Sequence, residues 1–171
     1  HHSYLEPHEA RINLNGQQTK VDIGGFSAVN GKLYELRKKY KNPLVLHAGD
    51  AITGTLYFTL FGGSADAAVM NAGNFHYFTL GNHEFDAGNE GLLKLLEPLK
   101  IPVLSANVIP DKNSILYNKW KPYDIFTVDG EKIAIIGLDT VNKTVNSSSP
   151  GKDVKFYDEI ATAQIMANAL K

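Results

Sequence analysis

The sequence FTLGNHEFD, residues 78–86, closes an apolar run with a neutral amide, an imidazole and a carboxylate. A strand that ends at Gly81 would expose Asn82 and His83 at its carboxyl end. Open α/β sheets place their binding crevices at that end of the strands. Amide oxygens, imidazole nitrogens and carboxylate oxygens bind metal ions, and amide and imidazole N–H groups donate hydrogen bonds to phosphate. This stretch therefore predicts a metal and phosphate site on an α/β sheet.

A second apolar run, LVLHAGD at residues 44–50, also ends with a glycine and a potential metal ligand. Residues 44–48 are short, continuous and apolar, which is typical of a buried parallel strand. Asp50 would then lie at the same edge of the sheet as Asn82. We therefore predict that Asp50 and Asn82 converge on one ion-sized site. The alternative is a turn or helix-capping role for Asp50.

The spacing of apolar residues and of glycine and proline predicts alternating strands and helices. Helices are expected at residues 24–40, 64–72, 89–99 and 158–170, and strands at 44–48, 75–80, 102–106, 123–128 and 132–138. Ser64 is expected to cap its helix, and Gly73 to end it in a left-handed conformation. Asp129-Gly130 predicts a hairpin turn, and residues 142–152 a loop. This order favours a layered α/β fold with a mixed sheet.

The composition is that of a soluble globular domain, with 171 residues, 43% hydrophobic and 20% charged. A net charge of −1 excludes the broad basic surface that nucleic-acid binding requires. The basic run at residues 37–41 is expected at a helix end. The absence of cysteine excludes disulfides, cysteine-based zinc sites and thiol nucleophiles. No apolar run reaches the roughly 18 residues of a membrane span.

Taken with His2, the Gly49-Asp50 pair and the GNHEFD motif resemble the amino-terminal metallophosphoesterase domain of the bacterial secreted 5′-nucleotidase family. The resemblance covers essentially the whole chain. It implies an α/β fold of four layers, α-β-β-α, with mixed sheets that are incomplete at both ends. Residues 1–171 would form the amino-terminal part of the catalytic domain, without the carboxy-terminal substrate-binding domain. The resemblance also implies a periplasmic or secreted protein.

The same resemblance implies a centre of two divalent metal ions, with Zn or Mn expected. It makes His2 a ligand of the first metal, Asp50 the bridge, and Asn82 a ligand of the second metal. A shared carboxylate relieves the repulsion between two cations, which a neutral ligand does not. His83 would stabilise charge on the phosphoryl oxygens, and Asp86 would orient its imidazole. The alternative for the last two residues is a turn pair without chemistry.

The other histidines and an aromatic cluster are expected to be structural. His8 is expected to be solvated in a loop. His47 and His76 lie inside apolar runs, so we expect both rings to be hydrogen-bonded within the fold. Three aromatic residues are expected in the core or at a domain contact rather than in a substrate cleft: Tyr57, Phe58 and Phe61.

The family resemblance implies hydrolysis of nucleotides or of the pyrophosphate of NAD. Alternatives are a 2′,3′-cyclic-nucleotide phosphodiesterase or a UDP-sugar hydrolase of the same family, and a non-catalytic surface or binding module from another class. The family's other metal ligands, an Asp before His1 and two His and one Gln after Lys171, fall outside this segment. We therefore expect the segment alone to bind metal weakly and to be inactive. Exposed strand edges predict self-association.

Overall fold

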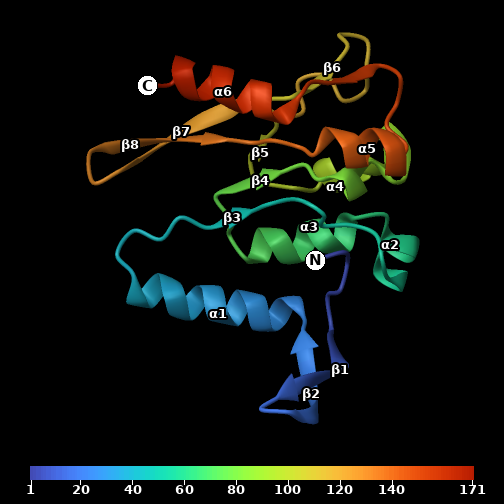
Figure 1. Cartoon of the computed structure of the whole chain (residues 1–171), viewed down its shortest axis with the longest axis vertical. Coiled ribbons are helices and arrows are strands. Elements are labelled where there is room, and N and C mark those ends of the chain that lie inside the picture. The colour runs from blue at the N-terminus through green and yellow to red at the C-terminus, as the bar shows by residue number, and fades with distance from the viewer.

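A computed structural model describes all residues, 1–171, and Figure 1 shows their elements arranged along one long axis. In chain order the elements are β1 (Pro7–Leu14), β2 (Gln17–Gly24), α1 (Phe26–Lys39), β3 (Leu46–His47), α2 (Leu56–Phe61), α3 (Ser64–Ala72), β4 (Tyr77–Thr79), the 3₁₀ helix η1 (Asn82–Phe85), α4 (Gly88–Leu96), β5 (Val103–Leu104), β6 (Val108–Pro110), β7 (Tyr123–Val128), β8 (Glu131–Ile136), α5 (Val141–Ser147), β9 (Val154–Phe156) and α6 (Glu159–Ala169). The hairpin β1–β2 lies at one end of the axis and α6 near the other. Between them come α1, α3, the sheet β3-β4-β5 and the hairpin β7–β8.

The parallel sheet β3-β4-β5 brings together the two sequence stretches that predicted the site. His47 pairs with Phe78, which in turn pairs with Val103. Helices α2 and α3 follow β3, and η1 and α4 follow β4, so the chain returns to the same end of the sheet before each next strand, as parallel pairing requires. Residues 48–50 and 80–82 therefore leave the sheet at the same edge.

The hydrophobic core forms where α3 and α4 pack on the sheet and on each other. Apolar residues three or four positions apart give each helix one buried face, with Ala67 and Met70 on α3 and Leu92, Leu95 and Leu96 on α4. Burying a Leu or Met side chain contributes about 1.5–3 kcal/mol to stability. The core thus fixes the helices and strands whose ends carry the polar site residues.

The remaining strands pair antiparallel, β1 with β2, β6 with β9 and β7 with β8. Asp129 and Gly130 turn the β7–β8 hairpin, with φ values of 48° and 85°. Two left-handed residues are what a tight hairpin turn requires, so this predicted turn is confirmed. Parallel and antiparallel pairing together confirm the predicted mixed α/β fold. Among the helices, none is both long and apolar enough to cross a bilayer.

The predicted loop at residues 142–152 is wrong for its first half, which forms helix α5. Its Thr144 is buried, and the hydroxyl donates a hydrogen bond of 2.8 Å to Asp139. A composition rich in Ser and Asn favours a loop when propensity alone is considered. Tertiary contacts around Thr144 outweigh that preference.

Helix α3 has the predicted bounds but not the predicted ends. Its N-cap is Gly63, and Ser64 is the first helical residue, donating its hydroxyl to the carbonyl of Phe61. Gly73 remains right-handed at φ −73°, and the left-handed residue is Asn74 at φ 50°. Asparagine tolerates this conformation better than most residues, so the left-handed residue after the helix lies one position later than predicted.

The amino-terminal region contains a hairpin that was not predicted. Strands β1 and β2 pair along their length, and Asn15-Gly16 makes the turn at φ values of 53° and 86°. His8 therefore lies in a strand rather than in the predicted loop, although it is exposed as expected. The prediction of a fully buried β3 was also wrong, since Leu46 is 49% exposed.

Candidate metal centre

Two loops at the carboxyl edge of the sheet touch backbone to backbone. Gly49 has φ +88°, and a Cβ atom there would lie 2.6 Å from the nitrogen of Gly81. A Cβ on Gly81 would in turn collide with the carboxylate of Asp50. Both positions therefore require glycine, the first also because its backbone is left-handed. This close approach is what places Asp50 against the start of the GNHEFD motif.

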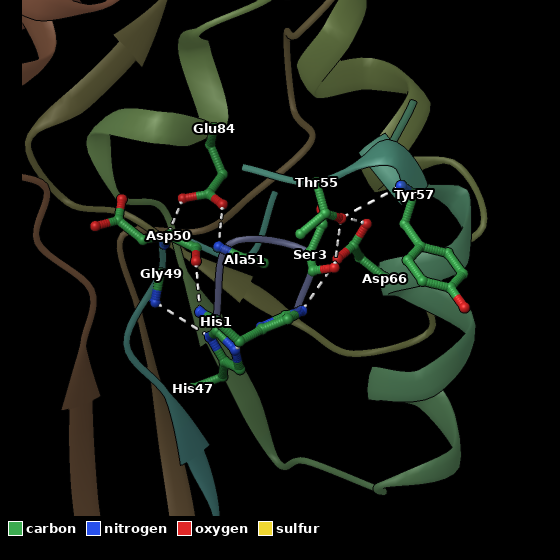
Figure 2. Close-up of polar contacts among 10 residues, drawn as sticks. All are labelled: His1, Ser3, His47, Gly49, Asp50, Ala51, Thr55, Tyr57, Asp66 and Glu84. Atoms are coloured by element: carbon green, nitrogen blue, oxygen red, sulfur yellow. Dashed lines mark hydrogen bonds and ion pairs between the residues drawn. The ribbon is translucent and has the colours of Figure 1, made fainter. Parts of the chain in front are cut away.

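The carboxylate of Glu84 ties the two loops together, as Figure 2 shows for its bonds to Asp50 and Ala51. It accepts hydrogen bonds from the backbone N–H groups of Gly81 at 2.6 Å, Asp50 at 2.8 Å and Ala51 at 2.7 Å. Burial of this fully enclosed group raises its pKa to about 7, while the three N–H donors oppose that shift. Three donors that cannot reverse direction favour the ionised carboxylate. No role of its own was predicted for Glu84, although it lies inside the GNHEFD motif.

Three side chains from the amino-terminal segment and these two loops form a cluster with metal-binding potential. One ligand atom from each of His2, Asp50 and His83 lies within 4.8 Å of the others, and all three side chains are partly exposed. The His2 and His83 rings are 4.6 Å apart between centroids and nearly perpendicular. Two imidazoles and a carboxylate are a donor set that suits a divalent ion such as Zn²⁺. The structure therefore fits a metal ion at this place.

Asp50 is held in an uncommon conformation within this cluster. Its φ of 52° is left-handed, which costs a non-glycine residue about 1–2 kcal/mol. The N–H groups of His2 and Ser3 donate to the carbonyls of Asp50 and Ala51 at 3.0 and 2.8 Å. The N–H of His83 donates to Oδ1 of Asp50 at 3.2 Å. These bonds offset the cost and fix the carboxylate close to the two histidines.

His83 and Asp86 form the pair that the sequence predicted. The Nδ1 atom of His83 lies 2.6 Å from Oδ2 of Asp86, and Oδ1 of Asp86 accepts the hydroxyl of Ser148 at 2.7 Å. A carboxylate next to Nδ1 favours the tautomer with its proton there, which leaves Nε2 for another partner. The geometry agrees with an orienting role for Asp86, which remains a prediction.

The structure differs from the prediction in where it places His83. His83, expected to act in catalysis, lies within the ligand cluster beside His2 and Asp50. Asn82 is partly buried at the start of η1 and lies between Gly81 and His83, whose backbones both contact Asp50. It is therefore at the same rim, and its role as a ligand of a second metal remains a prediction.

The side chains expected to be structural are mostly so. Nδ1 of His76 accepts the N–H of Val45 at 3.0 Å, and Nδ1 of His47 accepts that of Gly49 at 3.2 Å, so both are hydrogen-bonded as predicted. Of the three aromatic residues, Phe58 packs against the core, Tyr57 donates its hydroxyl to Glu6, and Phe61 is 52% exposed.

Comparison with known proteins gives the same picture as the site. The profile of the calcineurin-like phosphoesterase family matches residues 2–165. The chain is 98% identical over 171 residues to the NAD 5′-nucleotidase of Haemophilus influenzae, covering 100% of this chain and 28% of that protein. It is 56% identical over 160 residues to a probable 5′-nucleotidase of Treponema pallidum, covering 94% of this chain and 27% of that protein.

The fold is likewise that of solved relatives. The structure of Haemophilus influenzae NAD nucleotidase superposes with a TM-score of 0.96 at 97% identity, over 99% of this chain and 34% of that one. A 5′-nucleotidase precursor from Thermus thermophilus superposes with a TM-score of 0.88 at 37% identity, over 99% of this chain and 32% of that one. The chain thus spans about a quarter to a third of the length of these relatives.

Proposed function

We propose a nucleotide phosphohydrolase function from the premise that this chain belongs to the calcineurin-like phosphoesterase family. The observation that carries the proposal is the cluster of His2, Asp50 and His83, whose ligand atoms lie within 4.8 Å of one another. Such a cluster at the carboxyl edge of an α/β sheet is suited to hold divalent metal ions against a phosphate group. The family itself uses divalent metals, in agreement with this donor set.

Each residue of the cluster, and Asn82 beside it, has a role in this proposal. His2 would hold one ion through a ring nitrogen, Asp50 would hold both ions through its carboxylate, and Asn82 would hold the second ion through its amide oxygen. When bound, two such ions polarise the phosphoryl group and activate water near neutral pH. His83, held through Nδ1 by Asp86, presents Nε2 either to an ion or to a phosphoryl oxygen.

The substrate class comes from the relatives. Because one relative that matches the whole chain is an NAD 5′-nucleotidase and another that matches 94% of it is a probable 5′-nucleotidase, we assign nucleotides and NAD as substrates of the complete enzyme. In this proposal residues 1–171 are the amino-terminal part of its catalytic domain, and a separate carboxy-terminal domain selects the nucleotide. Zn or Mn is the proposed metal, and the periplasm is the proposed location.

The test is a metal-dependent hydrolysis assay on the full-length protein. After treatment with a chelator, Mn²⁺ or Zn²⁺ should restore phosphate release from AMP and cleavage of NAD. Replacing Asp50 by Asn removes the shared charge and should lower kcat by more than the roughly 10–100-fold typical of residues that only support metal ligands. Faster turnover of 2′,3′-cyclic AMP or of a UDP-sugar would reassign the substrate. A protein that binds no metal and has no activity would instead be a non-catalytic binding module.

A further inference from the structure

A buried carboxylate, Asp66, makes hydrogen bonds to both sequence neighbours of His2. Asp66, in the first turn of α3, is 0% exposed. Its Oδ1 lies 3.1 Å from Nε2 of His1, and its Oδ2 accepts the hydroxyl of Ser3 at 3.0 Å (Figure 2). Thr55 donates its hydroxyl to the carbonyl of Ser3 at 2.7 Å. The segment that carries His2 is therefore held on both sides of the candidate ligand.

The same network continues to the residue before Asp50. Nδ1 of His1 lies 3.0 Å from Nε2 of His47, and Nδ1 of His47 accepts the N–H of Gly49 at 3.2 Å. The contacts thus form one series, from Asp66 through two imidazole rings to Gly49. One end of the series reaches the segment of His2, and the other reaches the loop of Asp50.

The chemistry of the groups fixes the direction of every bond in this series. A backbone N–H only donates, so Nδ1 of His47 carries no proton. Neutral His47 then has its proton on Nε2 and donates to Nδ1 of His1. His1 in turn has its proton on Nε2 and donates to Asp66. The two oxygens of Asp66 accept from His1 and Ser3, which requires no proton on the carboxylate.

The electrostatics of the buried groups agree with these assignments. Burial lowers the pKa of His47 to about 4, so its ring is neutral near pH 7. Burial raises the pKa of Asp66 to about 6, while the hydrogen bond from Ser3 opposes the shift. Near pH 7 the carboxylate is therefore ionised and able to accept both bonds.

We infer that Asp66 is a positioning residue for the metal centre, which orders His1 and His47 in series and so holds His2 and Asp50 at a fixed separation. The inference rests on the proposed metal centre. Metal ligands depend on such supporting groups, and loss of one typically weakens metal affinity or activity by about 10–100-fold. Asp66 contacts none of the three cluster residues directly, so its effect passes through the segments that carry them.

The first test measures Mn²⁺ affinity by calorimetry in the full-length protein. Asp66→Ala removes both acceptor oxygens and should weaken binding by about 10–100-fold. Asp66→Asn keeps one oxygen for His1 and should recover much of that loss. The matched control is Asp111→Ala, which removes an exposed carboxylate paired with Lys155 and should leave affinity unchanged. Affinity of Asp66→Ala within twofold of the wild-type value would overturn the inference.

The second test reads the tautomers directly, from ¹⁵N shifts of selectively labelled histidine. In the wild-type protein His1 and His47 should both carry their proton on Nε2, and Asp66→Ala should mix the tautomers of His1. A proton on Nδ1 of His47 would refute the series. If Asp66→Ala does not fold, His47→Asn replaces it, because its amide oxygen can accept the N–H of Gly49 but cannot reach His1. Unchanged metal affinity in that variant would also refute the series.

Failure of the proposed function gives a different result. If the wild-type protein does not bind metal, the metal centre itself is contradicted. If the wild-type protein binds metal and the Asp66 variants bind it equally well, only the positioning role is contradicted.

Discussion

Replacing Glu84 by Gln should destabilise the protein by separating the two loops of the candidate metal centre. The carboxylate accepts two N–H groups on Oε2 and one on Oε1. A glutamine has a single acceptor oxygen, so the best orientation keeps the bonds to Gly81 and Asp50 and turns its amide towards the N–H of Ala51. The glutamine NH₂ group and the backbone N–H of Ala51, both hydrogen-bond donors, then face each other in the protein interior.

The magnitude follows from those unmatched donors. A buried polar group without a partner costs about 1–3 kcal/mol, and hydrogen bonds to a charged acceptor contribute about 1.5–3 kcal/mol each. Removing a buried charge offsets part of this loss. We therefore expect Glu84→Gln to lower the free energy of unfolding by about 2–4 kcal/mol.

Urea denaturation of the metal-free protein measures this loss without a contribution from metal binding. The matched control is Glu90→Gln, which changes an exposed glutamate on α4 and should stay within about 0.5 kcal/mol of the wild-type value. If Glu84→Gln were as stable as this control, the three hydrogen bonds to Glu84 would not hold the two loops together, and this role of Glu84 would be refuted.

Four further predictions test the site and the segment. Neutral His47, with a pKa lowered from 6.5 to about 4, contributes stability that is present above pH 6.5 and is lost as the pH falls towards 4. His47→Gln should therefore flatten the decline of unfolding free energy over that range, by up to about 3 kcal/mol, and an unchanged slope in urea titrations would contradict it. Asp86→Asn should lower kcat by about 10–100-fold with little change in metal affinity, and a loss confined to calorimetric affinity would argue against an orienting role. The isolated residues 1–171 should bind Mn²⁺ weakly and show negligible turnover, which two tight sites in a calorimetric titration would disprove. The same segment should associate through its strand edges, so a stable monomer in light scattering at high concentration would count against that expectation.

The site at the carboxyl ends of β3 and β4 was predictable because the residues that form it are neighbours in the sequence. The glycine, amide, imidazole and carboxylate of residues 81–86 follow a strand directly, and residues 48–50 do the same one strand away. Parallel pairing then requires both groups to meet. Neither the left-handed backbone of Asp50 nor the inclusion of His83 in the ligand cluster could be read from that pattern, because both depend on how closely the loops approach.

The hydrogen bonds that Asp66 makes to the segment of His2 were not predictable in the same way. Asp66 lies in the first turn of α3, where a carboxylate is common, and its partners His1 and Ser3 lie far away in the sequence. Helix α5 was missed because burial of Thr144 outweighs its composition. The β1–β2 hairpin was different, since Asn15-Gly16 is a recognised hairpin signal that our sequence analysis did not use.

The turn of that hairpin is a suitable place to attach a probe. A Cβ atom on Gly16 would have no neighbour within 4 Å, and Gln17 beside it is exposed. These 171 residues contain no cysteine, so Gln17→Cys would give the segment a single thiol. Exposed loop tips tolerate such changes well. A fluorophore attached there would sit at the opposite end of the long axis from α6, where it could report on tumbling of the domain without touching the candidate metal ligands His2, Asp50 and His83.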